Sequence, residues 1–225
     1  MPGPGSRLVR IAWPYLMLRS SSLAGSDTTA ISLRAILYFL VQSPECYGKA
    51  QAEVDEADKA GKLSACVSYA ECLQLPYLQA VMKEALRCHP GVSYPLDRVV
   101  PRGGADICGV HLLEGTIVGV NPAVIHRDTS IFGNDALSFR PEGWLTGDEE
   151  RTKLMDRHLM TFGYGFRSCI GKNISIMEMG NFIPQLLRGF NVEWASDDPE
   201  WYVFTYWFAR QEGLICRLKV RQKDA

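Results

Sequence analysis

The stretch FGYGFRSCIGKN, from Phe162 to Asn173, places one cysteine among glycines, aromatic residues and an arginine. A free cysteine is most often an inert, buried core residue. Cys169 does not fit that interpretation, because a helical pattern begins directly after it and Arg167 adds positive charge, so that the thiolate anion is favoured. Three glycines would let the backbone approach a flat, bulky group: Gly163, Gly165 and Gly171. Cys169 is therefore expected to be a ligand or a nucleophile.

The other cysteines and the histidines narrow the chemistry of Cys169. Seven cysteines, an odd number with no CxxC pair, argue against a disulfide framework and against a zinc knuckle. A papain-like protease needs a histidine partner, and none of the four histidines lies in a recognisable protease setting: His89, His111, His126 and His158. Haem iron, which can take a cysteine thiolate as its axial ligand, is the better match.

Length, composition and charge limit the class of protein. A chain of 225 residues with 47% hydrophobic content fits one compact domain, or at most two small ones. With 24 basic and 25 acidic residues, the overall charge suggests neither nucleic-acid binding nor attachment to an anionic membrane. The absence of a disulfide pattern indicates an intracellular, reduced protein.

Residues 1–22 form an atypical amino-terminal segment. They contain three arginines, several serines and no acidic residue, as in a transit peptide, but Pro2, Pro4 and Pro14 weaken that interpretation. The apolar run from Ile11 to Leu18 is too short to span a bilayer. The sequence therefore predicts neither a transmembrane anchor nor a secretion signal.

The first part of the chain has a helical pattern. Residues 30–41 are apolar on nearly every side, as in a helix surrounded by protein, and Pro14 could begin this helix. Residues 76–87 predict a second apolar helix, on which Glu84 and Arg87 lie off the buried stripe. The stripe itself recurs at three- and four-residue steps: Leu78, Val81, Met82, Ala85 and Leu86.

Capping and turn residues place further elements. A helix with Ser43 as its N-cap should close near Gly61, and Ser68 with Glu71 forms a capping box for a short helix. After Pro90 come short β-like runs such as TIVGV, divided by glycines expected in turns: Gly103, Gly104, Gly109 and Gly115.

The last part of the chain is mixed. Residues 138–168 are expected to form a long, irregular, charged loop. Residues 170–190 predict a helix with a kink at Pro184, and residues 201–220 predict a terminal strand pair that turns near Gly213. The whole pattern predicts a mainly α fold with small β-sheets, of the α+β class.

The cysteine loop resembles that of a known family. Phe162, Gly165, Arg167, Cys169 and Gly171 match, in type and spacing, the signature FxxGxRxCxG of the cytochrome P450 family. The resemblance implies a haem-thiolate monooxygenase with haem b as its cofactor. It also implies that Cys169 is the axial ligand of the iron, which pushes electron density toward dioxygen so that the O–O bond breaks.

A second motif, AGSDTT from Ala24 to Thr29, resembles the oxygen-binding helix of this family. The resemblance implies that Asp27 and Thr28 deliver protons to the oxygen being activated. Thr28 can donate a hydrogen bond to the carbonyl oxygen of Ala24, four residues earlier, and so open the helix locally. Small Ala24 and Gly25 would leave space above a flat cofactor. The alternative is a serine and threonine cluster near a helix start, where such residues favour caps.

The segment EALR, from Glu84 to Arg87, matches the ExxR motif of the family. By itself a Glu–Arg pair three residues apart is an ordinary surface ion pair, worth about 0.2–0.5 kcal/mol. Its position upstream of the cysteine loop implies instead a structural pair that locks that loop. FRPEGW resembles the FxPERW element, but Gly143 replaces the arginine that normally completes the network. The cysteine loop is therefore expected to be held less firmly.

The remaining site residues follow from the resemblance alone. Arg98 and Arg167 are expected to bond the haem propionates, with a solvated strand charge as the alternative for Arg98. Phe162, Gly163 and Ala24 are expected to lie against the haem. Substrate contacts are expected from one small residue and one short stretch: Ala24, Val92, Ser93 and Tyr94.

The resemblance covers residues 23–225 as a partial haem domain, equivalent to the carboxyl-terminal half of the fold with its oxygen-binding helix, ExxR helix, meander, cysteine loop and following helix. Fungal secondary-metabolism members such as pisatin demethylase are similar to the chain. They imply insertion of one oxygen atom from O2 into a small apolar organic substrate, with electrons from an NADPH-dependent reductase. Family members are usually anchored to the endoplasmic reticulum membrane.

A second hypothesis, from a different class, stays open. The chain could be a truncated, non-catalytic fragment that binds haem weakly or not at all and acts, if at all, through interaction with another protein chain. Loss of buried contacts would then leave a large apolar patch exposed and prone to association.

Overall fold

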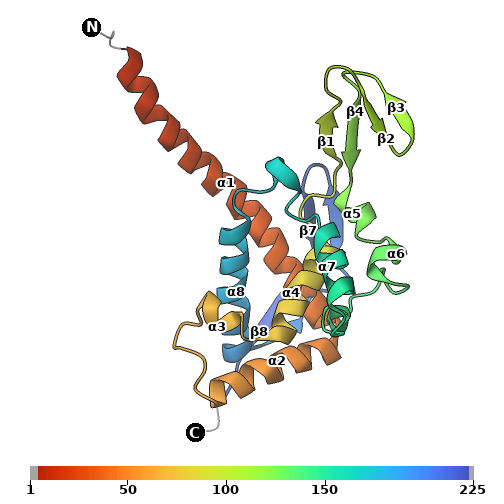
Figure 1. The fold of residues 1–225 in the computed structure, drawn as a ribbon. Coiled ribbons are helices and arrows are strands. Elements are labelled where there is room, and N and C mark those ends of the chain that lie inside the picture. The colour runs from red at the N-terminus through yellow and green to blue at the C-terminus, as the bar shows by residue number, and fades with distance from the viewer. Residues whose placement is uncertain (1–4, 223–225) are drawn as a thin grey trace.

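A computed structural model describes residues 5–222, with side chains from Ala24 onward (Figure 1). Helix α1 spans Gly5–Gln42, so Pro14 lies within the helix and does not begin it. The atypical segment 1–22 expected from the sequence lies outside the residues whose side chains are described, and a boundary at residue 23 stays a prediction. No helix in the described part of the chain combines the length and the apolar character that crossing a membrane requires.

Three helices form the centre of the molecule: α1, α4 (Pro76–Cys88) and α8 (Lys172–Gly189). Residues 31–41 of α1 have no exposed side chain, which confirms the prediction of a helix surrounded by protein. The stripe predicted for α4 is buried throughout. One apolar cluster joins the three helices, with members such as Ile36, Leu40, Leu78, Val81, Ala85, Ile183 and Leu187. The helices that carry the predicted motifs are therefore fixed to one another by a common core.

Two more helices flank this core. Helix α2 (Pro44–Lys59) begins at the predicted proline, but Ser43 makes no side-chain capping bond. Helix α3 (Tyr69–Cys72) has the predicted capping box, with Ser68 and Glu71 bonding each other's backbone N–H groups. Beyond α2, Gly61 has a φ of +66° and ends the helix as expected.

Four two-stranded antiparallel sheets complete the described part of the chain. Strand β1 (Leu96–Val99) pairs with β4 (Ile117–Val120), and β2 (Ala105–Ile107) pairs with β3 (Val110–Leu112). Figure 1 shows these two sheets as an arm that extends away from the helices. All four glycines predicted in turns of this arm have positive φ: Gly103, Gly104, Gly109 and Gly115. The α+β class expected from the sequence is confirmed.

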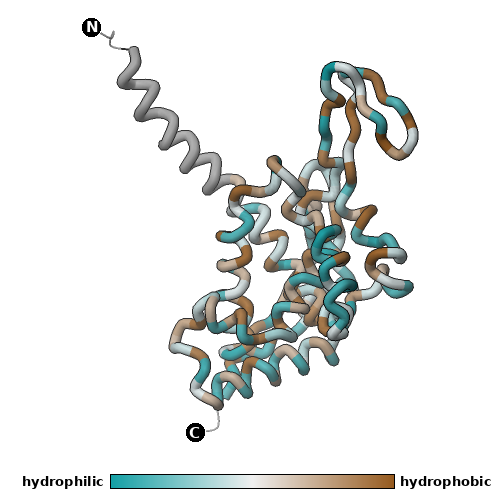
Figure 2. The backbone as a smooth tube through the Cα atoms, viewed as in Figure 1, coloured by the Kyte–Doolittle hydropathy of each residue, from teal (hydrophilic) through white to brown (hydrophobic). Residues whose placement is uncertain are grey.

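The segment between β4 and the cysteine loop is more regular than expected. It contains four short helices before the loop: α5 (Pro122–Ile125), α6 (Thr129–Phe132), the 3-10 helix η1 (Pro141–Trp144) and α7 (Glu149–His158). The expected irregular loop at 138–168 is therefore wrong over its middle. The Asp148 side chain caps α7, acidic residues fill its first turn, and Met155 is buried. Figure 2 shows α7 as mostly hydrophilic, which is why its pattern suggested a loop.

The carboxyl-terminal strands also differ from expectation. Strand β6 (Tyr202–Thr205) pairs with β7 (Ala209–Glu212), and the hairpin turns at residues 206–208. Strand β8 (Cys216–Val220) pairs instead with β5 (Phe190–Trp194). The predicted turn near Gly213 is therefore wrong: Gly213 has a φ of +79° but only links two sheets. Helix α8 continues through Pro184 without interruption.

Candidate functional site

The cysteine loop connects the 3-10 turn η2 (Gly165–Arg167) to the start of α8. Gly163 and Gly165 have φ values of +73° and +68°, a left-handed conformation that glycine adopts without strain. The loop turns back so that the Cys169 N–H donates a hydrogen bond to the Phe162 carbonyl oxygen at 2.8 Å. This bond closes the loop and fixes the backbone that carries the thiol.

The Cys169 thiol is free and exposed. An added Cβ at Gly171 would lie 3.8 Å from the Cys169 Sγ, so the sulfur lies against this glycine. Helix α8 begins at Lys172, and its N-cap Gly171 has no side chain to satisfy the first N–H groups. The positive end of the α8 dipole therefore lies close to Cys169 along the chain.

Two large apolar side chains close to Cys169 in the sequence are almost fully exposed. Phe166 is 92% exposed and Ile170 is 99% exposed, on either side of Cys169 in the sequence. Removal of apolar surface from water is favourable by about 25 cal/mol per Å². Adjacent exposed residues of this size therefore mark a surface suited to an apolar partner.

Two arginines expected to hold the cofactor are available for a carboxylate ligand. The arginines in ion pairs are Arg87, Arg140, Arg188 and Arg221, so neither Arg98 nor Arg167 has an acidic partner among the described residues. Arg98 is half-buried and donates from Nη1 to the Asp97 carbonyl oxygen at 2.7 Å, whereas Arg167 is exposed. The structure thus leaves both guanidinium groups free of competing acids.

These residues fit a haem by the chemistry of their donors. Among the described residues, no group of three or more histidine, cysteine or acidic side chains is arranged to hold a bare metal ion. A single free thiol suits a metal that a macrocycle already holds, and the exposed Phe166 and Ile170 suit a flat apolar surface. Glycine backbone at 163 and 165 leaves no Cβ in the way; at Gly165 an added Cβ would meet no atom within 4 Å.

The motif expected to handle oxygen lies on α1. The Thr28 hydroxyl donates to the Ala24 carbonyl oxygen at 2.7 Å, as predicted. The expected local opening is not seen, because the backbone stays α-helical through this turn. Asp27 is exposed and Thr28 is half-buried.

One hydrogen bond connects this motif to the helix that follows the cysteine loop. Thr29, next to Thr28, donates from Oγ1 to the Ser175 Oγ at 3.1 Å. Ser175 lies in the first turn of α8, six residues after Cys169. The oxygen motif and the cysteine loop are far apart in the sequence. Helices α1 and α8, which carry or follow them, are therefore in contact close to both motifs.

The segment between α4 and β1 connects the same two motifs. An added Cβ at Gly91 would lie 3.7 Å from Ile31 Cγ2 and 4.0 Å from the Thr28 carbonyl oxygen. At the other end of the segment, an added Cβ at Gly163 would lie 4.0 Å from Leu96 Cδ1. Five extended residues span at most about 18 Å, so Gly91, which contacts the oxygen motif, and Leu96, which contacts the cysteine loop, lie no farther apart than that.

Three of the predicted substrate residues, Val92, Ser93 and Tyr94, lie on this segment, whereas Ala24 lies on α1. Ser93 donates from Oγ to the Pro90 carbonyl oxygen at 3.0 Å, so its hydroxyl proton is already used. Val92 forms an isolated β-bridge with Phe208, and the Tyr94 ring lies 5.8 Å from the Trp207 ring. The tip of the β6–β7 hairpin therefore lies beside the segment. This hairpin was not among the predicted site residues, although its aromatic residues are apparent in the sequence.

The ExxR pair is buried in the interior. Arg87 donates from Nε and Nη2 to the two carboxylate oxygens of Glu84, each at 2.8 Å, and both residues are 3% exposed. Its other three N–H groups donate to backbone carbonyls of residues 121–148, which we call the meander: His126 at 2.7 Å, Ala136 at 2.6 Å and Ser138 at 2.8 Å. Every N–H of the guanidinium therefore has a partner.

The network is complete without the missing arginine. Glu84 accepts two further bonds, from the Arg140 N–H at 2.9 Å and from the Trp144 Nε1 at 2.8 Å. Gly143 leaves open space beside this pair, since an added Cβ would meet no atom within 4 Å. The expectation that Gly143 weakens the hold on the loop finds no support in these bonds, because Trp144 supplies the donor. Trp144 is the last residue of the FRPEGW motif, but its role as a donor to Glu84 was not predicted.

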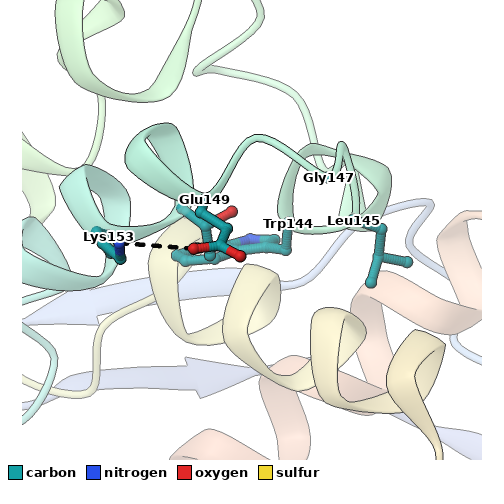
Figure 3. Close-up of a pocket in the computed structure, with 6 residues that line it drawn as sticks. Trp144, Leu145, Gly147, Glu149 and Lys153 are labelled. Atoms are coloured by element: carbon teal, nitrogen blue, oxygen red, sulfur yellow. Dashed lines mark ion pairs between the residues drawn. The ribbon is translucent and has the colours of Figure 1, made fainter.

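A separate hollow lies on the meander and α7. It has a volume of about 470 Å³ and is lined by six residues: Trp144, Leu145, Gly147, Glu149, Thr152 and Lys153. Figure 3 shows the ion pair of Lys153 and Glu149 on one side and the Trp144 ring in the middle. None of the residues predicted for the haem or substrate site lines this hollow.

Comparisons with known proteins agree with these features. The family model described as Cytochrome P450 matches residues 20–213. The chain is 44% identical to cytochrome P450 monooxygenase cicH of Emericella nidulans over 202 residues, which are 90% of this chain and 40% of that protein. It is 46% identical to a pisatin demethylase of Fusarium vanettenii over 189 residues, or 84% of this chain and 35% of the relative.

A third relative aligns with this chain over more residues than the first two. The cytochrome P450 monooxygenase ACRTS1 of Alternaria alternata is 39% identical over 221 residues, which cover 98% of this chain and 58% of that protein. The chain thus spans between about a third and three-fifths of the length of these relatives.

Proposed function

The chain belongs to the cytochrome P450 family, and we propose that it forms the haem-binding portion of a haem-thiolate monooxygenase. The reaction inserts one oxygen atom from O2 into a small apolar organic substrate, within fungal secondary metabolism. The observation that carries the proposal is the Cys169 thiol, which is free, exposed and set in a loop closed by its own backbone hydrogen bond.

Cys169 is the residue that holds the cofactor. When haem b is bound through the Cys169 thiolate, it supplies the chemistry that activates O2. The backbone N–H groups at the start of α8 are the donors available to the sulfur, and such bonds set how much electron density a thiolate gives. Phe162 and Gly163 belong to the same loop and would lie against the porphyrin.

Arg98 and Arg167 hold the propionates in this proposal. Neither guanidinium has an acidic partner among the described side chains, so binding a propionate displaces no ion pair. Charge-assisted bonds from arginine to a carboxylate are among the stronger hydrogen bonds in proteins.

Asp27 and Thr28 move protons in this proposal. The single Thr28 hydroxyl proton is donated to the Ala24 carbonyl oxygen, so the Thr28 oxygen presents its lone pairs as acceptors to water or to a protonated group. Asp27, one residue earlier and exposed, can take protons from solvent and pass them on.

An apolar substrate suits the residues proposed to contact it. Ala24 and Val92 offer no polar side-chain atom, and the Ser93 hydroxyl is occupied by the Pro90 carbonyl. The Tyr94 ring is 47% exposed and offers a flat apolar face. Electrons come from an NADPH-dependent reductase, as in the family.

The second candidate function is a non-catalytic one. The exposure of Phe166 and Ile170, on either side of Cys169 in the sequence, favours a chain that needs another partner before it can close a haem site. Such a chain would act, if at all, through protein interaction.

Labelled oxygen separates the two functions. The chain is supplied with haem, an NADPH-dependent P450 reductase, NADPH and ¹⁸O2, together with a panel of small aromatic and terpene hydrocarbons. The monooxygenase proposal expects products that carry one labelled oxygen, and the Cys169→Ala variant should form none. If no panel member gives a labelled product, and the wild-type and Cys169→Ala reactions are identical, the non-catalytic function is favoured.

A further inference from the structure

The last turn of α4 leaves backbone carbonyls that must find partners outside the helix. The final four carbonyls of an α-helix have no intrahelical donor. The Leu86 carbonyl would bond the N–H of residue 90, but Pro90 has none. The Thr161 hydroxyl supplies the missing donor at 2.9 Å. Thr161 directly precedes Phe162, so the entry to the cysteine loop is fastened to the end of α4.

The next carbonyl along α4 is satisfied by a histidine. The Arg87 carbonyl oxygen lies 2.9 Å from the His126 Nδ1. The other ring nitrogen, His126 Nε2, accepts the Met160 N–H at 2.8 Å. Both bonds require one neutral form of the ring, with the proton on Nδ1 and a lone pair on Nε2.

The surroundings of His126 keep it in this form. The side chain is 0% exposed, and the Phe132 ring meets it edge-on with the ring centres 6.0 Å apart. Burial lowers the pKa of His126 to about 4, and the nearby Arg87 guanidinium adds to the effect. The ring is therefore a rigid bridge with one donor and one acceptor.

Met160 leads directly to Cys169 through two backbone hydrogen bonds. The Met160 carbonyl oxygen accepts the Gly163 N–H at 2.9 Å, and the Phe162 carbonyl oxygen accepts the Cys169 N–H at 2.8 Å. Where Met160 is held therefore determines where the loop turns and where the backbone of Cys169 lies.

We propose that His126 is a positioning residue of the cysteine loop: its ring joins the Arg87 carbonyl at the end of the ExxR helix to the Met160 N–H at the base of the loop. The end of the ExxR helix thus acts on the loop through His126 and Thr161, since among the described residues the Arg87 side chain bonds only Glu84, Cys88 and the meander. The role of the loop in holding haem rests on the proposed function, whereas the bridge itself does not.

Two variants separate the two halves of the bridge. In His126→Gln the amide reaches the position of Nε2 and can still accept the Met160 N–H. In His126→Asn the shorter amide reaches the position of Nδ1 and can still donate to the Arg87 carbonyl, but it leaves the Met160 N–H without an acceptor. His89→Gln is the matched control, because His89 is also buried and bonds a backbone carbonyl, that of Ala209 at 2.9 Å, on another element.

Amide hydrogen exchange in the full chain without haem tests the bridge. We expect His126→Asn to speed exchange at Met160, Gly163 and Cys169 by about tenfold, as loss of one buried hydrogen bond implies. His126→Gln keeps the acceptor for Met160 but loses the donor to the Arg87 carbonyl, so we expect a smaller acceleration there, and His89→Gln should leave these three rates within about twofold of the wild type. Equal acceleration in His126→Asn and His89→Gln, or a uniform rise across all helices, would show a packing role only and overturn the inference.

Two further measurements keep the inference testable. If His126→Asn does not fold, ¹⁵N spectra of the wild-type histidines decide: a proton on Nδ1 is expected, and a proton on Nε2 would overturn the bridge. With haem added, the thiolate-type carbon monoxide spectrum should be retained in His126→Gln and partly lost in His126→Asn. If the wild type shows no such spectrum, the proposed function fails, while the exchange rates still judge His126.

Discussion

Glu84 and Arg87 form a bidentate ion pair in the protein interior, with two N–O distances of 2.8 Å and both residues 3% exposed. An isolated buried charge is costly, and this pair is stable because each partner neutralises the other and every remaining donor and acceptor is bonded. The pair therefore connects α4 to the meander by a set of bonds that cannot be removed one at a time without a penalty.

Removal of Arg87 should destabilise the protein strongly. Arg87→Ala leaves the Glu84 carboxylate buried without its counter-charge and frees three meander carbonyls, so we expect a loss of about 3–5 kcal/mol in the free energy of unfolding. Urea denaturation followed by circular dichroism measures it. Lys219→Ala, which removes an exposed ion pair with Glu193, is the control and should cost less than about 1 kcal/mol. Similar losses in both variants would contradict the account of the network.

Trp144 should supply the hydrogen bond that is lost because Gly143 stands in place of the family's arginine. Trp144→Phe keeps most of the ring but removes the Nε1–H that Glu84 accepts at 2.8 Å, so we expect a loss of about 1–3 kcal/mol in unfolding free energy. Gly143→Ala is the control, because its Cβ meets no atom within 4 Å and the change should stay below about 1 kcal/mol. An unchanged unfolding free energy in Trp144→Phe would contradict the account that Trp144 compensates for the arginine missing at position 143.

Acid should destabilise the protein through its buried histidines. Burial lowers the pKa of His126 to about 4 and also lowers the pKa of His89. The ordinary pKa of a histidine side chain is about 6.5, so below pH 6.5 these histidines bind protons more readily in the unfolded chain than in the native state. The stability from a neutral His126 is therefore fully present above pH 6.5 and is lost as the pH falls toward about 4, by up to about 1.4 kcal/mol per pH unit.

Denaturation midpoints between pH 7.5 and 4.5 check this dependence. His126→Gln cannot titrate and should show a shallower loss of stability with falling pH than the wild type. An equal slope in wild type and His126→Gln would mean that His126 does not carry a proton-linked share of the stability.

Thr28 should control how reducing equivalents are used. Thr28→Ala removes the hydroxyl that bonds the Ala24 carbonyl oxygen and leaves the haem ligand untouched, so the haem spectrum should be unchanged while several-fold more NADPH is spent on hydrogen peroxide. Thr28→Ser keeps a hydroxyl and should resemble the wild type. Peroxide yields that do not differ among the three proteins would remove Thr28 from proton delivery.

The parts of the fold that could be predicted are those with strong local patterns. The apolar faces of α1 and α4, the capping box at Ser68 and the glycine turns near β2 all lie where one segment decides its own structure. Helix α7 was missed because its residues are nearly all hydrophilic and a single side chain, Met155, is buried. The pairing of β8 with β5 depends on contacts between distant segments, which no local pattern contains.

The candidate site was predicted as separate motifs but not as connected parts. Cys169 was identified from its neighbours in the sequence, whereas the structural role of the Glu84–Arg87 pair was assigned from the resemblance to the family. The contacts that bring the motifs together were not predictable, because each joins segments remote in sequence: Thr29 with Ser175, and His126 with Met160. Serine, threonine and histidine at such positions have many ordinary uses, so no sequence signal distinguishes a bridging residue before the fold is known.

The carbon monoxide spectrum of the reduced protein tests the central claim most directly. The chain is purified with haem supplied, reduced and exposed to carbon monoxide, and the Soret band is recorded for the wild type and for Cys169→Ala. The exposed Cys66, replaced by alanine, serves as the control for a thiol outside the loop. We expect the red-shifted band of a thiolate-bound haem in the wild type and in Cys66→Ala, and its absence in Cys169→Ala. A wild-type spectrum without that band, or one that survives Cys169→Ala, would contradict the account.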